Sequence, residues 1–504
     1  MIRKMLLCAA VVLSSICAQA YHKTVVISCG GLEEALAGDL SFTSIAIEGS
    51  ADVRDFAFLH DNATSIKAID LSECSIAMYD SRNEHYLGHH THFDAHTIPP
   101  SAFFGFAALE RVTLPATLVA ISDGAFAGCE RLLSVTGGNA LTMIGDYAFA
   151  GCSALSEFSM PISLRRIGDY AFDKCSSLKS VDMSSCTQLE YLGIRAFAQN
   201  GVLQQVVLPE SMETIGNYAF AGCGALERVV MPVHLSLLGE GAFVSCTALS
   251  SIDMKDCDIA ELSAWTFASC THLQQVLLPI TISRVAEGAF YYCTSLQQIE
   301  LPEGIATLDA FAFAGCSALQ HISFIPEGVE SIERYAFYRN ISASKAHIPT
   351  TVSYIGDHAF DGCINAMNFV TYREMPAELG EEVFANMEIE KKTLGVETES
   401  VVIYSSTAQW QDFGTINGIT AVEDVTICTD ITTYFDAYNL IVTAPQEIVE
   451  MRLFDTSGIL LAYVEPGDCD ATIDTHPFTT NLYLVQVVMA DGRRVVAKVA
   501  RIIR

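Results

Sequence analysis

Apolar residues recur through the middle of the chain in a pattern that repeats about every 23 residues. One unit reads L-x-x-V-x-L-P-x-x-L-x-x-I-G-x-x-A-F-x-x-C, and the stretch from Leu203 to Cys223 fills it. A period of this length is typical of a solenoid, whose copies stack because one unit cannot bury its own apolar side. The phenylalanine occurs thirteen times at intervals of 23 to 25 residues: Phe103, Phe126, Phe149, Phe172, Phe197, Phe220, Phe243, Phe267, Phe290, Phe313, Phe337, Phe360 and Phe384.

Each part of the unit predicts a local structure. The alternating apolar positions of L-x-x-V-x-L predict a short, half-buried strand. The proline that follows ends this strand, because proline cannot donate to the next ladder hydrogen bond. The glycine of the I-G pair is expected to make a tight bend with a positive φ. The A-F-x-x-C segment returns the chain over the core, so the phenylalanines are predicted to form one buried ladder.

The cysteines of the repeat are predicted to be buried free thiols. Stacked neighbours would have parallel Cβ vectors, which is poor geometry for a disulfide. In two units Asn200 and Asn340 take the cysteine position, so it favours a small group that meets a loop backbone. Outside the repeats, Cys428 and Cys469 are the candidates for a disulfide. Nine cysteines follow a repeat phenylalanine by three residues: Cys129, Cys152, Cys175, Cys223, Cys246, Cys270, Cys293, Cys316 and Cys363.

The start of the chain predicts export. Arg3 and Lys4 precede an apolar run from Met5 to Ile16, and Ala18-Gln19-Ala20 has the small-x-small form of a cleavage site. Residues 1–20 are therefore predicted to be a secretory signal peptide. Its removal changes the formal net charge from −31 to −33, since two cations leave. Such acidity argues against nucleic acid and anionic membranes as partners. No later apolar run is long enough to predict a membrane span.

The repeat resembles the bacterial leucine-rich repeat of the BspA-like type, with its L-P step, I-G bend and A-F-x-x-C return. The resemblance covers residues 99–419, and Trp410–Ile416 is similar to the closing W-x-x-F-x-x-I of such arrays. Residues 21–98 are similar to the lead-in cap. Relatives of this type are exported or surface-displayed proteins of host-associated bacteria, and some bind extracellular matrix or other cells. The resemblance thus implies adhesion.

From residue 420 to 504 the period gives way to β-type alternation, which predicts a small antiparallel sandwich. Met451–Gly458, Asn481–Val485 and the terminal Lys498-Val499 resemble the sorting domain of type IX secretion. A plain immunoglobulin-like accessory domain is the alternative. The expected strands are Asn439 to Thr443, Ile448 to Phe454, Ile459 to Val464, Leu482 to Met489 and Arg494 to Val499.

Chemistry has few candidates in this chain. The sequence lacks G-x-S-x-G, H-E-x-x-H, C-x-x-C and a glycine-rich phosphate loop, so we expect no enzyme activity and no cofactor. One loop concentrates imidazoles at a density that suits zinc or copper, but the spacing matches no known site and a solvated surface loop is the favoured interpretation. This loop holds His85, His89, His90, His92, His96 and Asp94.

The outward positions of the predicted strands provide the candidate binding surface. Most are polar, but three apolar residues gather near the middle of the array beside an arginine and a glutamine. Exposed apolar clusters often mark interfaces, whereas the alternative is that these residues only favour strand structure. The predicted patch, called here the sheet-face patch, comprises Val207, Arg228, Val230, Gln275 and Leu277.

These observations predict a leucine-rich repeat solenoid of about 13 repeats of 23–25 residues, with short parallel strands and a mostly irregular convex side. A cap at 21–98 precedes the array at 99–419, and a small antiparallel β-sandwich follows at 420–504. The expected role is a non-enzymatic module at the cell surface that binds a host or bacterial surface protein or glycan, as in adhesion. A metal-binding or enzyme-associated protein using the His85–His96 loop, and a structural spacer, are the alternatives.

Overall fold

The computed structural model describes residues 21–81, 86–87, 91–419, 432–436, 439–455, 460–475, 482–490 and 494–500. The chain divides into two compact units, residues 1–417 and 418–504. The predicted signal peptide lies outside the described residues. Among the helices in the described part of the chain, none has the length and apolar character needed to cross a bilayer.

The first unit opens with a parallel sheet and two helices. Strands β1 (His22–Ile27), β2 (Ser44–Ala51) and β3 (Ala68–Asp70) lie side by side, and β4 (Cys74–Ile76) also pairs with β2. Helices α2 (Leu32–Leu36) and α3 (Val53–Asn62) complete this part, and β5 (Tyr79–Asp80) pairs with β6 (His92–Phe93). Asp55 joins the two helices, since its carboxylate accepts from the backbone of both Leu32 and Asp52. The sheet continues into the array through β8 (Arg111–Leu114), so cap and array share one core.

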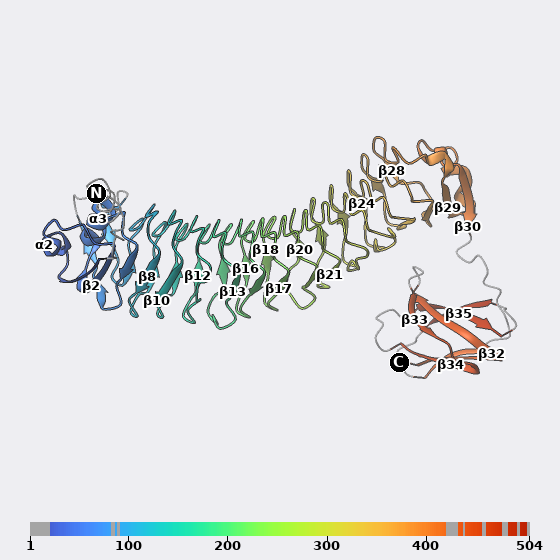
Figure 1. The fold of residues 1–504 in the computed structure, drawn as a ribbon. Coiled ribbons are helices and arrows are strands. Elements are labelled where there is room, and N and C mark those ends of the chain that lie inside the picture. Colours follow the sequence, from blue (N-terminus) through green and yellow to red (C-terminus); the bar gives the residue numbers. More distant parts are fainter. Residues whose placement is uncertain are drawn as a thin grey trace, which may run out of the picture. The chain divides into compact units, whose positions relative to one another are not determined.

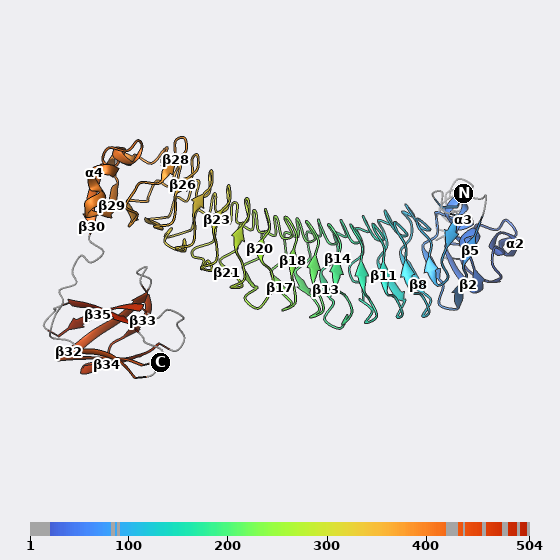
Figure 2. The same ribbon diagram turned by 180° about the vertical axis from the view of Figure 1, so that it is seen from behind.

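The repeats form a stack of coils, each contributing up to two short strands (Figures 1 and 2). From residue 97 to residue 397 the strand pairs between consecutive coils are parallel, as predicted. The L-x-x-V-x-L segments form the strands of the first column: β8 (Arg111–Leu114), β10 (Ser134–Gly137), β13 (Ser180–Asp182), β15 (Gln205–Val207), β17 (Arg228–Val230), β19 (Ser251–Asp253), β21 (Gln275–Leu277), β25 (Lys345–Ile348), β27 (Asn368–Thr371), β29 (Thr393–Glu397) and β30 (Thr415–Ile419).

This first column is interrupted, and a second column runs beside it. The segments around Glu157 and Gln298 form no strand, and Ile322 makes only an isolated bridge to Ala346. The second column, which the sequence analysis did not predict, comes from the x-I dipeptides: β7 (Thr97–Ile98), β9 (Ala120–Ile121), β11 (Met143–Ile144), β12 (Arg166–Ile167), β14 (Tyr191–Leu192), β16 (Thr214–Ile215), β18 (Leu237–Leu238), β20 (Glu261–Leu262), β22 (Arg284–Val285), β23 (Thr307–Leu308), β24 (Ser331–Ile332), β26 (Tyr354–Ile355) and β28 (Glu378–Leu379).

The predicted phenylalanine ladder is confirmed. Each of the thirteen rings stacks on the next, with centroids 5.0 to 6.0 Å apart and planes within 19° of parallel. Twelve of the rings are completely buried, and Phe384 at the end of the ladder is 6% exposed. Trp410 and Phe413 close the column by packing edge-on against Phe384. The array therefore has one continuous core.

The repeat cysteines are free and buried, also as predicted. Each thiol donates to the carbonyl oxygen of the ladder phenylalanine one coil earlier, at 3.1 to 3.2 Å. Where the slot holds Asn200, the amide nitrogen donates to the same kind of carbonyl, that of Phe172, at 3.1 Å. The slot thus favours a small side chain that can donate to the neighbouring backbone.

The prediction for the I-G glycine was wrong. Gly145, Gly216 and their equivalents have no positive φ. A Cβ on Gly145 would lie 2.8 Å from the backbone nitrogen of Asp123, so close approach between coils excludes a side chain here. The left-handed residues lie instead two positions before and two positions after each ladder phenylalanine. Their φ values are +49° to +62° and +56° to +76° respectively, in all thirteen coils.

The second unit is an antiparallel β structure with its own small core. A single long strand, β32 (Asn439–Asp455), spans two of the predicted strands and pairs with β31 (Thr432–Asp436), β33 (Leu460–Val464), β34 (Asp468–Asp474) and β35 (Leu482–Met489). Strand β36 (Arg494–Ala500) pairs with β35. The sheet curls into a half-barrel around Leu440, Met451 and Val485. Strands β31 and β34 were not predicted.

Candidate binding surfaces of the array

The structure brings together part of the predicted sheet-face patch. Strands β15 and β17 pair in register, so Val207 lies beside Val230 and Gln205 beside Arg228. Both valines are half-buried, and the Arg228 side chain is exposed. Because successive residues of a strand point to opposite faces, these outward residues share one face while Val206 and Val229 are buried behind them. The result is a small apolar pair with a cation at its edge.

Leu277 and Gln275 lie farther along the same face. Strand β19 separates them from Val230, and its Asp253 is the register partner of Leu277. The Asp253 carboxylate lies 3.6 Å from the Lys255 amine. A charged residue therefore lies between the valine pair and Leu277, which is 37% exposed.

A second surface lies where the coils turn before and after each ladder phenylalanine. The left-handed residue two positions before the phenylalanine is often aromatic. Tyr147 stacks on Tyr170 at 4.7 Å, and Phe311 stacks on Tyr335 at 4.9 Å. Where a larger ring leans over the next coil, that coil has glycine: a Cβ on Gly288 would lie 2.3 Å from the Trp265 ring. The residues form a column of partly exposed rings along the array.

Six rings of this turn surface form one connected network, called here the aromatic cluster. Tyr291 is its centre, with ring centroids 5.5 Å from Trp265, 4.6 Å from Tyr292 and 6.2 Å from Phe311. Phe311 continues through Tyr335, which packs edge-on against the sixth ring, that of Tyr338, at 5.5 Å. Aromatic pairs in such geometry contribute beyond their buried area, so the cluster is expected to be rigid.

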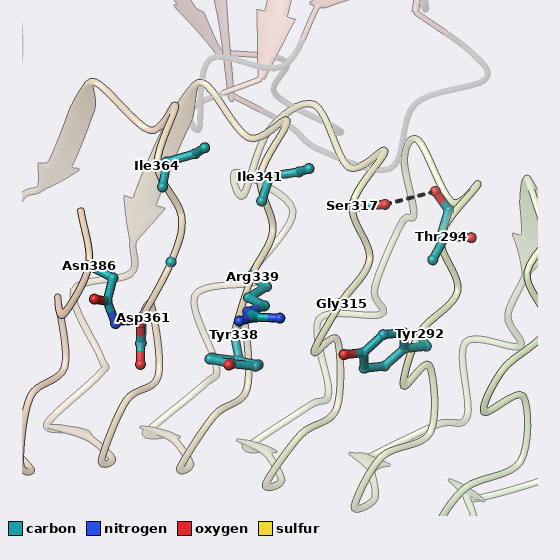
Figure 3. A pocket seen from close by; sticks show the side chains of 11 residues that line it. Tyr292, Thr294, Gly315, Ser317, Tyr338, Arg339, Ile341, Asp361, Ile364 and Asn386 are labelled. Carbon is teal, nitrogen blue, oxygen red and sulfur yellow. Dashed lines mark hydrogen bonds between the residues drawn. The ribbon is translucent and has the colours of Figure 1, made fainter.

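The aromatic cluster borders a shallow trough with a volume of about 460 Å³. In Figure 3, Tyr292, Tyr338 and Asp361 lie along one side, and Thr294, Ser317, Ile341 and Ile364 lie along the other. Gly315 and Arg339, both left-handed residues, lie between the two rows. The trough residues come from consecutive coils and are Tyr292, Thr294, Gly315, Ser317, Tyr338, Arg339, Ile341, Asp361, Gly362, Ile364 and Asn386.

The polar groups of the trough differ in how fully they are satisfied. Asp361 is 6% exposed, and its carboxylate accepts from the Asn386 amide at 2.9 Å and contacts the His358 ring nitrogen at 3.1 Å. The Arg339 guanidinium lies 5.2 Å from the centroid of the Tyr338 ring. Within the described part of the chain, this guanidinium has no hydrogen bond and no carboxylate partner. The trough therefore offers one cation that lies over an aromatic ring and keeps its N–H donors available.

The sequence analysis missed this surface. The signal was present in the residue two positions before the ladder phenylalanine, as in Tyr218-Ala219-Phe220 and Tyr335-Ala336-Phe337. No role was assigned to that position from the sequence alone. Neither the left-handed backbone that turns Tyr335 outward nor the approach of Tyr292 and Tyr338 from separate coils follows from the alternation of apolar residues.

The histidine-rich loop is only partly described. His85, His89 and His90 lie outside the described residues. His92 is exposed and its Nε2 lies 3.2 Å from an Asp94 carboxylate oxygen. In the described ranges, no group of three or more His, Cys, Asp or Glu side chains has a metal-binding arrangement. Cys469 is an exposed free thiol, and its predicted partner Cys428 lies outside the described residues.

Comparison with known proteins gives a consistent family. The sequence model described as "BspA type Leucine rich repeat region (6 copies)" matches residues 96–223, 190–296 and 283–405. Similar solved structures include a leucine-rich repeat protein of Bacteroides ovatus and a leucine rich cell surface protein of Faecalibacterium prausnitzii. Both are 25% identical with a TM-score of 0.40 over 60% of this chain, covering 86% and 87% of theirs. The T. pallidum leucine-rich repeat protein is 32% identical over 30% of this chain and 71% of its own, with a TM-score of 0.29. No curated protein matches significantly.

Proposed function

The chain belongs to the BspA-type leucine-rich repeat family, and from this premise we propose that it is an exported, non-enzymatic protein that binds a partner at the cell surface in adhesion. Leucine-rich repeat arrays typically serve protein–protein binding, because stacked repeats create an extended surface on a rigid core. The continuous phenylalanine ladder supplies such a core here. The partner is a host or bacterial surface protein or glycan.

The observation that carries the proposal is the register of β15 and β17. It places Val207 beside Val230 on the outward face, with the exposed Arg228 next to them. Arginine is enriched among the hot-spot residues that contribute most of the affinity at protein interfaces. Exposed clusters of apolar residues also frequently mark such interfaces. We therefore assign protein binding to the sheet-face patch of Val207, Arg228, Val230, Gln275 and Leu277.

The ends of the chain support the cellular location that we propose. The basic start and apolar run of residues 1–20 suit a signal peptide. The antiparallel second unit suits a sorting domain that directs the protein across the outer membrane and to the cell surface. In this proposal the array is the part that binds and the second unit is the part that is recognised during export.

Two measurements on the natural protein test the proposal. An antibody against the array should label intact, unpermeabilised cells, because the array is outside the cell. The mature chain should also be retained on an immobilised panel of extracellular matrix proteins and glycans. Labelling only after permeabilisation would contradict the location, and retention by no member of the panel would contradict the binding role and favour a structural spacer.

A further inference from the structure

We propose that the trough beside the aromatic cluster binds a saccharide chain, lying along the stack of coils across the Tyr292 and Tyr338 rings. This site is separate from the sheet-face patch, and the inference does not depend on protein binding there. Its volume of about 460 Å³ is within the range of small-molecule sites, about 300 to 1,000 Å³. Its residues come from consecutive coils, so a linear ligand can cross several of them.

The backbone around Tyr292 lays its ring open to a ligand in the trough. Gly315 lies under this ring, since a Cβ at Gly315 would be 3.0 Å from Tyr292 Cδ2. The absence of a side chain at Gly315 lets the ring lie along the coil surface, where Tyr292 is 37% exposed. Tyr338 contributes a second, half-buried ring two coils further on, with the Arg339 guanidinium over it (Figure 3). A flat, exposed phenol ring matches the apolar C–H face of a pyranose, because the ring face carries partial negative charge.

Both hydrogen-bond donors and acceptors surround these rings. The unpaired Arg339 guanidinium has only donors. The hydroxyl of Ser317 donates to the Thr294 carbonyl and keeps its acceptor lone pairs. The Asn386 amide nitrogen is taken by Asp361, which leaves its amide oxygen as an acceptor. Sugar hydroxyls both donate and accept, so they can satisfy donors and acceptors placed along one trough.

An extended peptide suits this trough less well than a saccharide does. Strand addition requires free backbone groups, but those on the floor of the trough are used between coils. The Gly315 nitrogen donates to the Tyr338 carbonyl at 2.7 Å, and the Arg339 nitrogen donates to the Asp361 carbonyl at 2.8 Å. The Gly315 carbonyl in turn accepts from the Ser317 nitrogen at 2.8 Å. The trough is also shallow, whereas the dominant side chains of protein interfaces fill desolvated pockets. Ring stacking and side-chain hydrogen bonds remain, which is the chemistry of saccharide recognition.

Variants that copy neighbouring coils can remove the site without disturbing the fold. Tyr292 occupies the left-handed position that is Gly315 in the next coil, so Tyr292→Gly suits its φ of +56°. Tyr338 occupies the position that is Ala314 in the preceding coil, so Tyr338→Ala copies a natural residue. The matched control is Tyr147→Gly, which copies Gly124 and removes an exposed ring of the same turn surface outside the trough.

The mature chain, residues 21–504, should be applied to immobilised neutral and uronic-acid oligosaccharides, and the retained oligosaccharide should then be titrated into each variant by calorimetry. We expect the double variant Tyr292→Gly, Tyr338→Ala to bind at least tenfold more weakly and Tyr147→Gly to bind within twofold of the natural chain. Unchanged binding by the double variant would overturn the proposal. So would retention of no oligosaccharide by the natural chain.

The outcome is separable from that of the proposed function. If the natural chain is retained by a matrix protein but by no oligosaccharide, the saccharide site is refuted and the proposed function stands. If an oligosaccharide binds and the double variant loses it, the trough is assigned whether or not a protein partner is found.

Discussion

The Cys223 thiol donates a hydrogen bond to the backbone carbonyl oxygen of Phe197, 3.2 Å away in the preceding coil. The same relationship recurs in every coil that has a cysteine in this slot. The cysteine side chain packs in the core and at the same time satisfies a backbone carbonyl of the preceding coil. It therefore couples the buried ladder to the turn that follows it. It also explains why the array has so many unpaired thiols: the slot selects for a donor and for size.

Asn340 tests this explanation, because it occupies the slot without forming the bond. Neither its amide nitrogen nor its amide oxygen has a hydrogen-bond partner, although the residue is completely buried. Leaving a buried polar group unsatisfied costs about 1 to 3 kcal/mol. Asn340→Cys should therefore raise the free energy of unfolding by about that amount, measured by urea denaturation. The control is Asn200→Cys, which should give a smaller gain, because the Asn200 amide nitrogen already donates to Phe172 and Phe197 and only its amide oxygen lacks a partner. Equal stabilisation at both positions would refute the role of the donor.

Removing one central ring of the ladder should lower the free energy of unfolding substantially. Phe220 stacks on Phe197 at 5.8 Å and on Phe243 at 5.5 Å and is completely buried. Phe220→Ala should lower the free energy of unfolding by about 3 to 5 kcal/mol, through lost burial and the cavity that remains. Phe104→Ala is the matched control, because Phe104 is 56% exposed. Its effect should stay within about 0.5 kcal/mol, and similar losses for both variants would be inconsistent with a buried ladder.

The buried thiols should make the free energy of unfolding depend on pH. Burial raises the pKa of Cys129, Cys223, Cys270 and Cys363 to about 12, from an ordinary value of 9.0. Above pH 9 the unfolded chain loses these protons while the folded chain keeps them, so the unfolded state gains stability. We expect the urea midpoint to be unaffected by these thiols below pH 8 and to fall as the pH rises from 9 toward 12. Replacing Cys223 with serine should reduce that fall, and an unchanged profile would show that this thiol does not contribute.

The corrected role of the I-G glycine makes a separate prediction. A Cβ at Gly216 would lie 2.6 Å from the backbone carbonyl carbon of Gly193, so Gly216→Ala forces two coils apart. Overpacking of this kind costs about 1 to 3 kcal/mol. Gly201 is the matched control, since its Cβ would meet no atom within 4 Å and its φ is not positive. Thermal unfolding should show a clear loss for Gly216→Ala and none for Gly201→Ala. A stable Gly216→Ala would mean that the coils can separate freely.

The parts of the fold that were predictable are those with a long period. Phe220 and Cys223 recur at fixed spacing with their type preserved, so a buried ladder and a common slot follow from the sequence. The x-I strands, such as β16, were not predicted because two residues are too short to show an alternation. The I-G glycine was misread because glycine at a bend has two explanations, positive φ and close approach, and only the positions of the adjacent backbones distinguish them.

The candidate sites were less predictable for a physical reason. The Val207 and Val230 pair follows from strand register, since equivalent residues of adjacent coils must lie side by side. The trough depends instead on where Tyr292 and Tyr338 point. Tyr292 has left-handed backbone, at a position that holds glycine in one coil and a large residue in another, and Tyr338 directly precedes the left-handed Arg339. Strand β32 joins two segments that were predicted as separate strands. The alternation of apolar and polar residues does not show whether a strand ends at a given residue or continues through a bend.

The most direct test of the binding role changes the outward face without changing the core. Asp182 and Asp253 already occupy the column of Val207 and Val230, so the double variant Val207→Asp, Val230→Asp suits the strand. Thr113→Asp with Thr136→Asp is the matched control, two register partners on β8 and β10. Affinity for the matrix protein that retains the natural chain should be measured by surface plasmon resonance. The account predicts at least a tenfold loss for the valine variant and little change for the control. Equal affinity of both variants and the natural chain would contradict binding through the sheet-face patch.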